Sequence, residues 1–382
     1  MSMPVAVTEA RLGSHSYGES TPYSIGVEEE FQLIHPDTYD LVQRVDEVLE
    51  QASLDDLEQI KRELMQSVVE TATRVCANTA EAAADVTTLR RRVAELAANS
   101  GALIASAGTH PFARYEFQKI SNVERYKQII DRLQWIARRE LIFGLHVHVG
   151  IGSPDKAMYV LNHIRAYLPE MLALSANSPF WQGRATGLQS SRSKIFDSFP
   201  RSGLPPTFAS YAEWDALMHR SARLGVLEDY TFIWWDARLH PKFGTVEIRV
   251  CDAQTRVSDS LALAALIQGV CAWLGEQYDL GVQRDIPPLM LVGENKWNAA
   301  RYGLDGEFID FETDTVIPTL EAVSRLIERA APYMNDLGSA EEFAALDSLL
   351  IRNGATRQLD CHAETGSLVS VGRMLANESR VV

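Results

Sequence analysis

The residues of this chain best suited to chemistry form three pairs, each spaced by one position and set in an apolar run. The pairs are Glu28 and Glu30, His146 and His148, and Glu247 and Arg249. Carboxylate oxygens favour Mg²⁺ or Mn²⁺, and imidazole widens the choice of divalent metal ions. A guanidinium group beside such a metal can hold phosphate oxygens in a bidentate fork. Brought together, the three pairs would form a metal and phosphate site.

A β-sheet would position these pairs, because side chains two positions apart on a strand point to the same face. The flanking residues are β-branched or bulky and apolar, as strands packed on a core require. Glu29 would point to the opposite face and is the member of its trio least suited to bind a ligand. One such pair usually marks only the exposed face of a sheet. Three pairs in apolar runs favour a site instead.

The alternation of apolar patterns predicts an α/β protein of the α+β type. We expect a curved, mainly antiparallel sheet of six strands with helices packed on its outer face. Strands are expected over residues 23–34, 65–71, 101–108, 142–151, 230–236 and 245–251. Helices are expected over residues 42–63, 81–99, 122–139, 155–176, 258–278 and 319–331. Residues 1–18 are expected to be a flexible N-terminus, and residues 19–382 a single domain.

The composition excludes several classes of partner. The chain has 382 residues, of which 46% are hydrophobic, and a formal net charge of −15. So acidic a chain lacks the basic surface that nucleic-acid binding requires. Its four cysteines are widely spaced without a C-x-x-C motif, as in reduced cytoplasmic proteins. No signal-peptide pattern opens the sequence, and the most apolar stretch, residues 260–274, is too short to span a membrane. We expect a cytoplasmic protein and, by default, a homodimer.

Several segments together resemble the glutamate–cysteine ligase type 2 (YbdK-like) carboxylate–amine ligases, whose catalytic fold is that of glutamine synthetase and the guanido kinases. The segments are GVEEEFQLI, ELMQSVVETAT, GTHPFA, GLHVHVGI, SPFWQGRATGLQSSRSKIFDSFPRSGLP, GTVEIRVCD and ENKWNAARYGL. They run from about Tyr23 to beyond Tyr302. G-x-E-x-E-F, H-V-H and E-x-R in this order resemble the wider superfamily, and SPFWQGRATGL resembles this branch.

The resemblance implies an ATP-dependent ligase that activates the γ-carboxylate of glutamate as an acyl phosphate and joins it to an amine, with weak glutamate–cysteine ligase activity. It implies ATP and Mg²⁺, or Mn²⁺, as cofactors. The implied metal ligands are Glu28, Glu30, Glu70, His146 and Glu247, with Glu63 as a further acidic candidate. The implied ATP-binding residues are His148, Arg249 and Arg238. The implied substrate-binding residues are Arg184, Arg192 and Glu70, and Arg192 and Arg249 are the implied catalytic residues.

The stretch from residue 178 to 206 is too long for a simple connection and is expected to be a substrate loop. Within it, the resemblance favours Arg184 and Arg192 over the other cations. We expect one to contact the amino-acid carboxylate and the other the transferred phosphate. His110, which precedes a proline, fits a loop histidine as well as a site residue.

Two alternatives remain at this point. His146 and His148 at a strand end, with glutamate partners, could also hold Zn²⁺ in a metal-dependent amide hydrolase. A non-catalytic binding protein on the same fold is the other alternative. The sequence lacks the P-loop motif, a G-x-G-x-x-G turn and an H-E-x-x-H helix. ATP would therefore have to be held by metal ions on a sheet, as the resemblance implies.

Overall fold

The computed structural model describes residues 14–381, and its centre is an antiparallel sheet. Within these residues the sheet has seven strands in the order β10-β11-β5-β1-β3-β2, with β4 also pairing with β1. Five of the six expected strands belong to this sheet, and its two edge strands, β2 and β10, were not expected. The bounds are β1 Ile25–Ile34, β2 Ile60–Arg62, β3 Val68–Ala72, β4 Leu103–Ala105, β5 Leu145–Gly150, β10 Ala237–His240 and β11 Thr245–Ile248.

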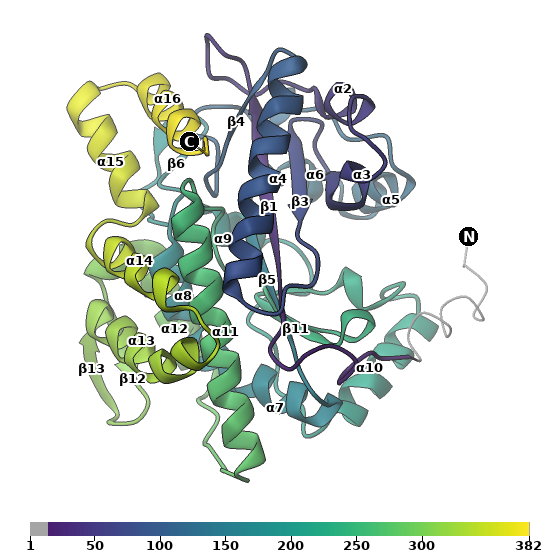
Figure 1. Ribbon diagram of the computed structural model, residues 1–382, viewed down its shortest axis with the longest axis vertical. Helices are drawn as coiled ribbons and strands as arrows, with labels where there is room; N and C mark the ends of the chain where they lie inside the picture. The colour runs from purple at the N-terminus through teal and green to yellow at the C-terminus, as the bar shows by residue number, and fades with distance from the viewer. Residues whose placement is uncertain (1–13, 382) are drawn as a thin grey trace.

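Two long helices, α4 (Thr79–Asn99) and α11 (Val257–Asp279), cover one face of the sheet (Figure 1). Glu29 points to this face, as its strand position predicts, and accepts hydrogen bonds from Arg90 Nε at 2.8 Å and Ser260 Oγ at 2.6 Å. Helix α11 is long and apolar enough to cross a membrane, but 89% of its apolar window is buried inside the protein. It is therefore a core helix.

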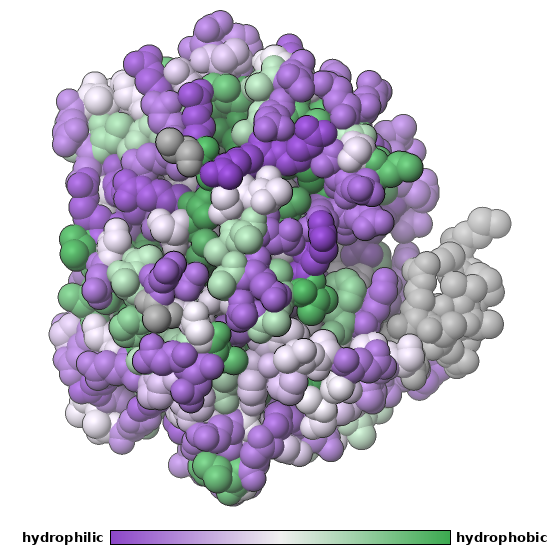
Figure 2. Space-filling model, viewed as in Figure 1, coloured by the Kyte–Doolittle hydropathy of each residue, from purple (hydrophilic) through white to green (hydrophobic). Residues whose placement is uncertain are grey.

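Further helices pack around α11 and along the edges of the sheet. They are α2 Val45–Glu50, α3 Asp56–Gln59, α5 Glu124–Leu133, α6 Trp135–Arg138, α7 Pro154–Ile164, α8 Leu168–Ser175, α9 Ser191–Phe196, α10 Tyr211–Arg223, α12 Leu289–Tyr302, α13 Thr319–Asp336, α14 Ala340–Ile351, α15 Gly354–Thr365 and α16 Leu368–Glu378. Short strand pairs are β6 Phe180–Trp181 with β7 Arg184–Ala185, β8 Ser202–Gly203 with β9 Trp234–Trp235, and β12 Glu307–Asp310 with β13 Thr315–Pro318. The face in Figure 2 is mostly hydrophilic, with scattered apolar side chains.

The helix expected over residues 42–63 is wrong except in two short pieces, α2 and α3, which residues 51–55 separate. Residues 60–62 form β2, which pairs with β3 so that Ile60 lies opposite Thr71 and Lys61 opposite Glu70. The polar, helix-compatible composition of this stretch is overridden by pairing with a buried neighbouring strand, a common outcome of tertiary context. The correction matters because this β2–β3 hairpin carries two acidic residues of the site.

The strand expected over residues 230–236 is also wrong. Asp229 accepts a hydrogen bond from the backbone N–H of Thr231 at 2.8 Å, which favours the 3-10 turn Tyr230–Phe232. Only β9 is extended there, and it pairs with β8 outside the main sheet. The edge strand of the main sheet is β10, which follows directly and turns into β11.

Two other expected helices are interrupted, and part of the expected flexible N-terminus makes backbone hydrogen bonds. Gln134 has a positive φ of 52° and separates α5 from α6, while a 3-10 turn, Arg165–Tyr167, separates α7 from α8. Residues 1–13 of the expected flexible segment lie outside the described residues. Ser16 and Gly18, which we also expected to be flexible, donate backbone hydrogen bonds to Pro241 and Ile151.

Candidate active site

The cross-strand register brings the three polar pairs onto one face of the sheet, opposite α4 and α11. Glu28 lies opposite His146, and Glu247 lies opposite His148. Two further residues join the same face, since Glu30 is paired with Glu70 and Glu247 with Arg238. The strand spacing therefore predicted the shared face correctly.

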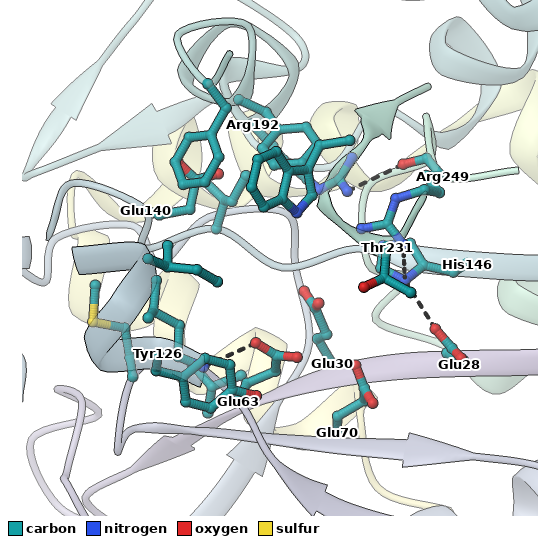
Figure 3. Close-up of a pocket in the computed structure, with 18 of the residues that line it drawn as sticks. Glu28, Glu30, Glu63, Glu70, Tyr126, Glu140, His146, Arg192, Thr231 and Arg249 are labelled. Carbon is teal, nitrogen blue, oxygen red and sulfur yellow. Dashed lines mark hydrogen bonds and ion pairs between the residues drawn. The ribbon is translucent and has the colours of Figure 1, made fainter. Parts of the chain in front are cut away.

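A cavity of about 240 Å³ opens above this face. Figure 3 shows Glu30, Glu63 and Glu70 on one side of it, and Glu140 and Arg192 on the other. The lining residues are Glu28, Glu30, Glu63, Leu64, Met65, Val68, Glu70, Arg125, Tyr126, Ile129, Glu140, Ile142, His146, Arg192, Phe196, Phe199, Thr231, Trp234, Arg238 and Arg249. Helices α5 and α9 thus form walls over a floor of charged strand residues.

Glu30, Glu63 and Glu70 form an acidic cluster in which one oxygen of each lies within 4.8 Å of the others. Backbone N–H groups fix two of them: Gly144 donates to Glu30 at 2.6 Å and Leu64 to Glu63 at 2.8 Å. Burial, together with the charge of Glu63, raises the pKa of Glu30 to about 7. Burial also raises the pKa of Glu63 and of Glu70. Three buried carboxylates this close fit a divalent cation, which would remove their mutual repulsion.

Glu28, His148 and Glu247 form a second potential ligand set with the same 4.8 Å spacing. The hydrogen bond between His148 Nδ1 and Thr245 Oγ1, 3.0 Å long, orients the imidazole ring. Nε2 makes no hydrogen bond in the described part of the chain and lies 3.4 Å from Glu28 and 3.9 Å from Glu247. This is how a metal-binding histidine is commonly held by its surroundings.

The geometry of the described residues favours the opposite assignment of the two histidines from the one expected. We expected His146 at the metal and His148 toward ATP, but His148 belongs to the ligand set. His146 Nδ1 is 3.2 Å from Glu28 and 3.5 Å from Arg249 Nη1. Burial, and then the charge of Arg249, lowers the pKa of His146 to about 4. His146 is therefore a neutral neighbour of Glu28 and lines the cavity.

Two arginines hold Glu247. Arg238 bonds it through Nε and through Nη2, the latter at 3.2 Å, and Arg249 bonds it through Nη1. Burial opposes ionisation, but these guanidinium charges hold the pKa of Glu247 well below its usual value. Arg238 and Arg249 both line the cavity, so their charge faces the space where a ligand would lie. The short hairpin β10–β11 places Arg238 there, as expected.

Arg192 and Arg184 have different surroundings, although both belong to the expected substrate loop. The guanidinium of Arg192, on α9, donates to the carbonyl oxygens of Val250 at 3.2 Å and Arg249 at 3.1 Å. Within the described residues its guanidinium hydrogen bonds go to these carbonyl oxygens and to no carboxylate, so its charge remains available to the cavity. Arg184 lies exposed on β7 and is not among the lining residues. The expectation for Arg184 is therefore corrected.

His110 is a loop histidine. Its Nδ1 accepts a hydrogen bond from the backbone N–H of Ala113 at 2.9 Å, and its Nε2 lies 2.9 Å from the carbonyl oxygen of Tyr39. Both ring nitrogens are thus used locally. His110 does not line the cavity.

A second cavity, of about 530 Å³, lies along the same strands and shares Glu28 with the first. His148 and Thr245 also line it, and the half-exposed ring of Phe243 forms part of its wall. Phe243 is stacked on His240 with the ring centroids 4.1 Å apart. The second ligand set therefore lies where the two cavities meet.

Sequence reasoning missed the walls of both cavities. Glu140, Tyr126, Trp234 and Phe243 belong to helices, turns or short strands outside the three motifs. Glu140 precedes the strand with the two histidines, and no periodic pattern distinguishes it from a surface glutamate. Such residues are brought to a cavity by tertiary packing, which local spacing does not encode.

Comparison with known proteins identifies the family. The family model described as "Glutamate-cysteine ligase family 2 (GCS2)" matches residues 24–372. The chain belongs to this family. A Rubrobacter xylanophilus protein named "Putative glutamate–cysteine ligase 2-1" is 41% identical over 99% of this chain and 98% of its own length. A Herpetosiphon aurantiacus protein named "Putative glutamate–cysteine ligase 2" is 40% identical over 94% and 93%, respectively.

Solved structures show the same fold at low sequence identity. A Francisella tularensis glutamate–cysteine ligase in complex with AMP has a TM-score of 0.67 and 11% identity, over 95% of this chain and 90% of that one. A bifunctional glutathione synthetase from Pasteurella multocida has a TM-score of 0.68 and 13% identity, over 94% of this chain and 52% of that one. This GCS2 family member is an ATP-dependent carboxylate–amine ligase, an enzyme that forms a carbon–nitrogen bond.

Proposed function

We propose that this GCS2 protein uses ATP to phosphorylate the γ-carboxylate of glutamate and then transfers the resulting acyl group to an amine. The observation that carries the proposal is the pair of ligand sets on one sheet face, at the junction of two cavities. A ligase needs this combination because a carboxylate is a poor electrophile until it is activated. Activation brings an anionic carboxylate to an anionic phosphate, and the repulsion must be neutralised.

Divalent metal ions, when bound, would supply most of that neutralisation as positive charge beside the phosphates. The residues that would hold them are Glu30, Glu63 and Glu70 in one set, and Glu28, His148 and Glu247 in the other. Glu70 thus has a metal-binding role in this proposal, and the substrate-binding role that we also expected stays a prediction. Mg²⁺ suits the all-carboxylate set, and Mn²⁺ suits the set that contains an imidazole.

The arginines would act on the transferred phosphate and on the glutamate carboxylate. Arg249 lies between the two ligand sets, close to His146 and Glu247, so it can reach oxygens of the phosphate chain. Arg192 projects from α9 at the cavity wall, and its guanidinium is hydrogen-bonded to backbone carbonyl oxygens, not to a carboxylate, among the described residues. Preorganised positive charge of this kind stabilises the transition state of phosphoryl transfer.

The second cavity fits the base and ribose of ATP. It is more apolar at its wall, where Phe243 offers an aromatic face for a purine ring, and it begins at the shared residue Glu28. The triphosphate would then run past Glu28 toward the acidic cluster, where glutamate meets the terminal phosphate. Replacing Phe243 by Ala is expected to raise the KM for ATP and to leave the KM for glutamate unchanged, as steady-state kinetics would measure.

The test is hydroxamate formation. Purified protein is mixed with MgATP, hydroxylamine and either glutamate or another carboxylic acid, and hydroxamate and ADP are measured. Glutamate is expected to give both products in equal amounts. Glu30→Gln should abolish them, because it removes a carboxylate from the acidic cluster. Glu364→Gln, at an exposed position far from both cavities in the sequence, is the matched control and should retain full activity.

Two other results would contradict the proposal. ADP formation without hydroxamate for any acid would indicate an ATPase. Hydroxamate from an acid other than glutamate would show that glutamate is not the acid substrate. The carboxylate–amine ligase class would survive the second result.

A further inference from the structure

Glu140 is the acidic residue of the cavity that belongs to neither ligand set. It lies in the turn between α6 and β5 and lines the cavity on the side of Arg192, across from Glu30, Glu63 and Glu70 (Figure 3). Both carboxylate oxygens are buried and make no hydrogen bond in the described part of the chain. An unpartnered buried carboxyl group is costly, so its presence at the wall of a ligand cavity calls for a partner from the ligand.

The charges around Glu140 come from three elements. Arg192 on α9 and Arg139 next in the chain stabilise its ionised form, whereas Glu30 on β1 opposes it. Burial is the largest influence and raises the pKa of Glu140 to about 8. At neutral pH a carboxyl group with this pKa is mainly protonated in the empty cavity, and a bound ammonium ion would favour the ionised form, which can take a proton and release it again. The acidic cluster cannot serve in this way while its carboxylates bind metal.

We infer that Glu140 receives the amine substrate as an ammonium ion and takes the proton that prevents its attack. The inference rests on the proposed function and names the substrate class, a primary amine that is cationic at neutral pH. The cavity side with Glu140 would then hold the amine, and the side with the acidic cluster the phosphate being transferred. The amine would thus reach the acyl carbon from one side of the cavity, and the phosphate would leave toward the other.

The proton balance of the step is complete. The Glu140 carboxylate takes one proton from the ammonium group, and the nitrogen lone pair forms the C–N bond to the acyl carbon. The bond between that carbon and the phosphate oxygen breaks, and the oxygen keeps the electron pair. The second nitrogen proton passes to the departing phosphate, which leaves as hydrogen phosphate. Glu140 then releases its proton to solvent.

The test compares two kinds of nucleophile in Glu140→Gln. Hydroxylamine is mainly uncharged at neutral pH and needs no base, so hydroxamate formation should stay within about twofold of wild type. Reactions with ammonium, methylamine or L-cysteine should slow by about a hundredfold, the usual contribution of a general base. Raising the pH should restore the variant as free amine accumulates. Glu364→Gln is again the matched control.

A second variant protects the test against a folding defect. Glu140→Ala opens space at the wall, and added formate is expected to restore amine-dependent turnover but not to change hydroxamate formation. Equal loss with hydroxylamine and with amines would overturn the role of Glu140 and leave the ligase proposal intact. Wild-type protein that makes hydroxamate but accepts no amine would likewise overturn the role of Glu140 and leave the ligase proposal intact. No hydroxamate in wild-type protein would overturn both proposals.

Discussion

At the scale of single residues, the acidic cluster cannot be fully ionised at low energetic cost without a cation. Glu30 and Glu70 lie directly opposite each other on paired strands, where like charges destabilise a sheet. Burial, and then the charge of Glu63, raises the pKa of Glu30 to about 7. Without metal, the folded state therefore favours the protonated carboxyl. This contribution to stability is full below the ordinary pKa of 4.5 and is lost as the pH rises through about 7.

A first prediction follows for metal binding. Mg²⁺ binds the deprotonated carboxylates, so saturating MgCl₂ should raise the Tm more at about pH 8 than at about pH 6. Glu30→Gln should remove most of this pH dependence, because its amide does not titrate. Differential scanning fluorimetry measures the shift in Tm, with CaCl₂ and NaCl as ionic controls. An Mg²⁺ effect of the same size at both pH values would show that Glu30 does not bind the metal.

A second prediction separates two arginines of one loop. Arg192→Lys should lower kcat for hydroxamate formation by roughly 10- to 100-fold, because lysine cannot keep both carbonyl contacts and present charge to the cavity. Arg184→Lys should leave kcat and both KM values unchanged, since Arg184 is exposed on β7. The pair is matched in chemistry and differs in position. Wild-type kinetics for Arg192→Lys would remove Arg192 from the mechanism.

How well the sequence predicts each site residue depends on whether local spacing or tertiary packing determines its position. Strand periodicity placed Glu28 and Glu30 on one face, because a period of two fixes direction. It could not order the two histidines, since both share that face and their hydrogen bonds decide which ring nitrogen is free. The exposure of Arg184 depends on how its short hairpin packs. Glu140 carried no local pattern at all.

At the scale of secondary-structure elements, a buried lysine connects three segments around the cavity. Lys296 on α12 lies 2.9 Å from Asp197, at the end of α9, and 2.7 Å from Asp236, just before β10. Burial alone would lower its pKa, but the charges of Asp236 and Asp197 raise it. These contacts hold the helix with Arg192 and the strand with Arg238 in fixed relation.

Breaking this connection should affect both stability and the site. Lys296→Met leaves Asp236 buried without its partner and should cost about 3–5 kcal/mol of unfolding free energy. The KM for glutamate should rise with it, as Arg192 loses its support. Lys194→Met removes the other, half-exposed partner of Asp197 and should cost at most about 1 kcal/mol. Urea denaturation and steady-state kinetics of the two variants give the comparison.

The incorrectly predicted elements share a physical cause. Residues 60–62 form a strand only because β3 lies beside them, and the aromatic run near residue 232 turns because Asp229 caps it. In both cases a contact overrides the local pattern: a pairing strand in the first, and a capping carboxylate two residues away in the second. The strands β1, β5 and β11 were predicted well because their apolar runs are long and their pattern is independent of such neighbours.

At the scale of the whole molecule, the central sheet separates stability from chemistry. On the helical face, Glu29 and Arg90 form a buried ion pair whose arginine also donates to the carbonyl oxygens of Thr255 and Gln254. On the other face lie the two ligand sets. Adjacent residues of β1 thus serve the core and the site. The homodimer expected from the sequence stays a prediction, which light scattering would check.

Substitution of the core pair should reveal this division. Arg90→Met leaves the Glu29 carboxylate buried without its partner and should cost about 3–5 kcal/mol of unfolding free energy. The double variant Glu29→Gln with Arg90→Met should recover part of this loss. The KM for ATP of protein that remains folded should not change. A large increase in that KM for the double variant would show that the two faces are coupled.

The pairing of Glu30 with Glu70 also bears on how the chain folds. Strands β1 and β3 must come together with two like-charged side chains opposed, while β11, some two hundred residues away, completes the second ligand set. Contacts so distant in sequence form late and slowly. Divalent cations would relieve the repulsion as the strands meet, so the refolding rate, and not only the final stability, should increase with Mg²⁺ concentration in stopped-flow experiments.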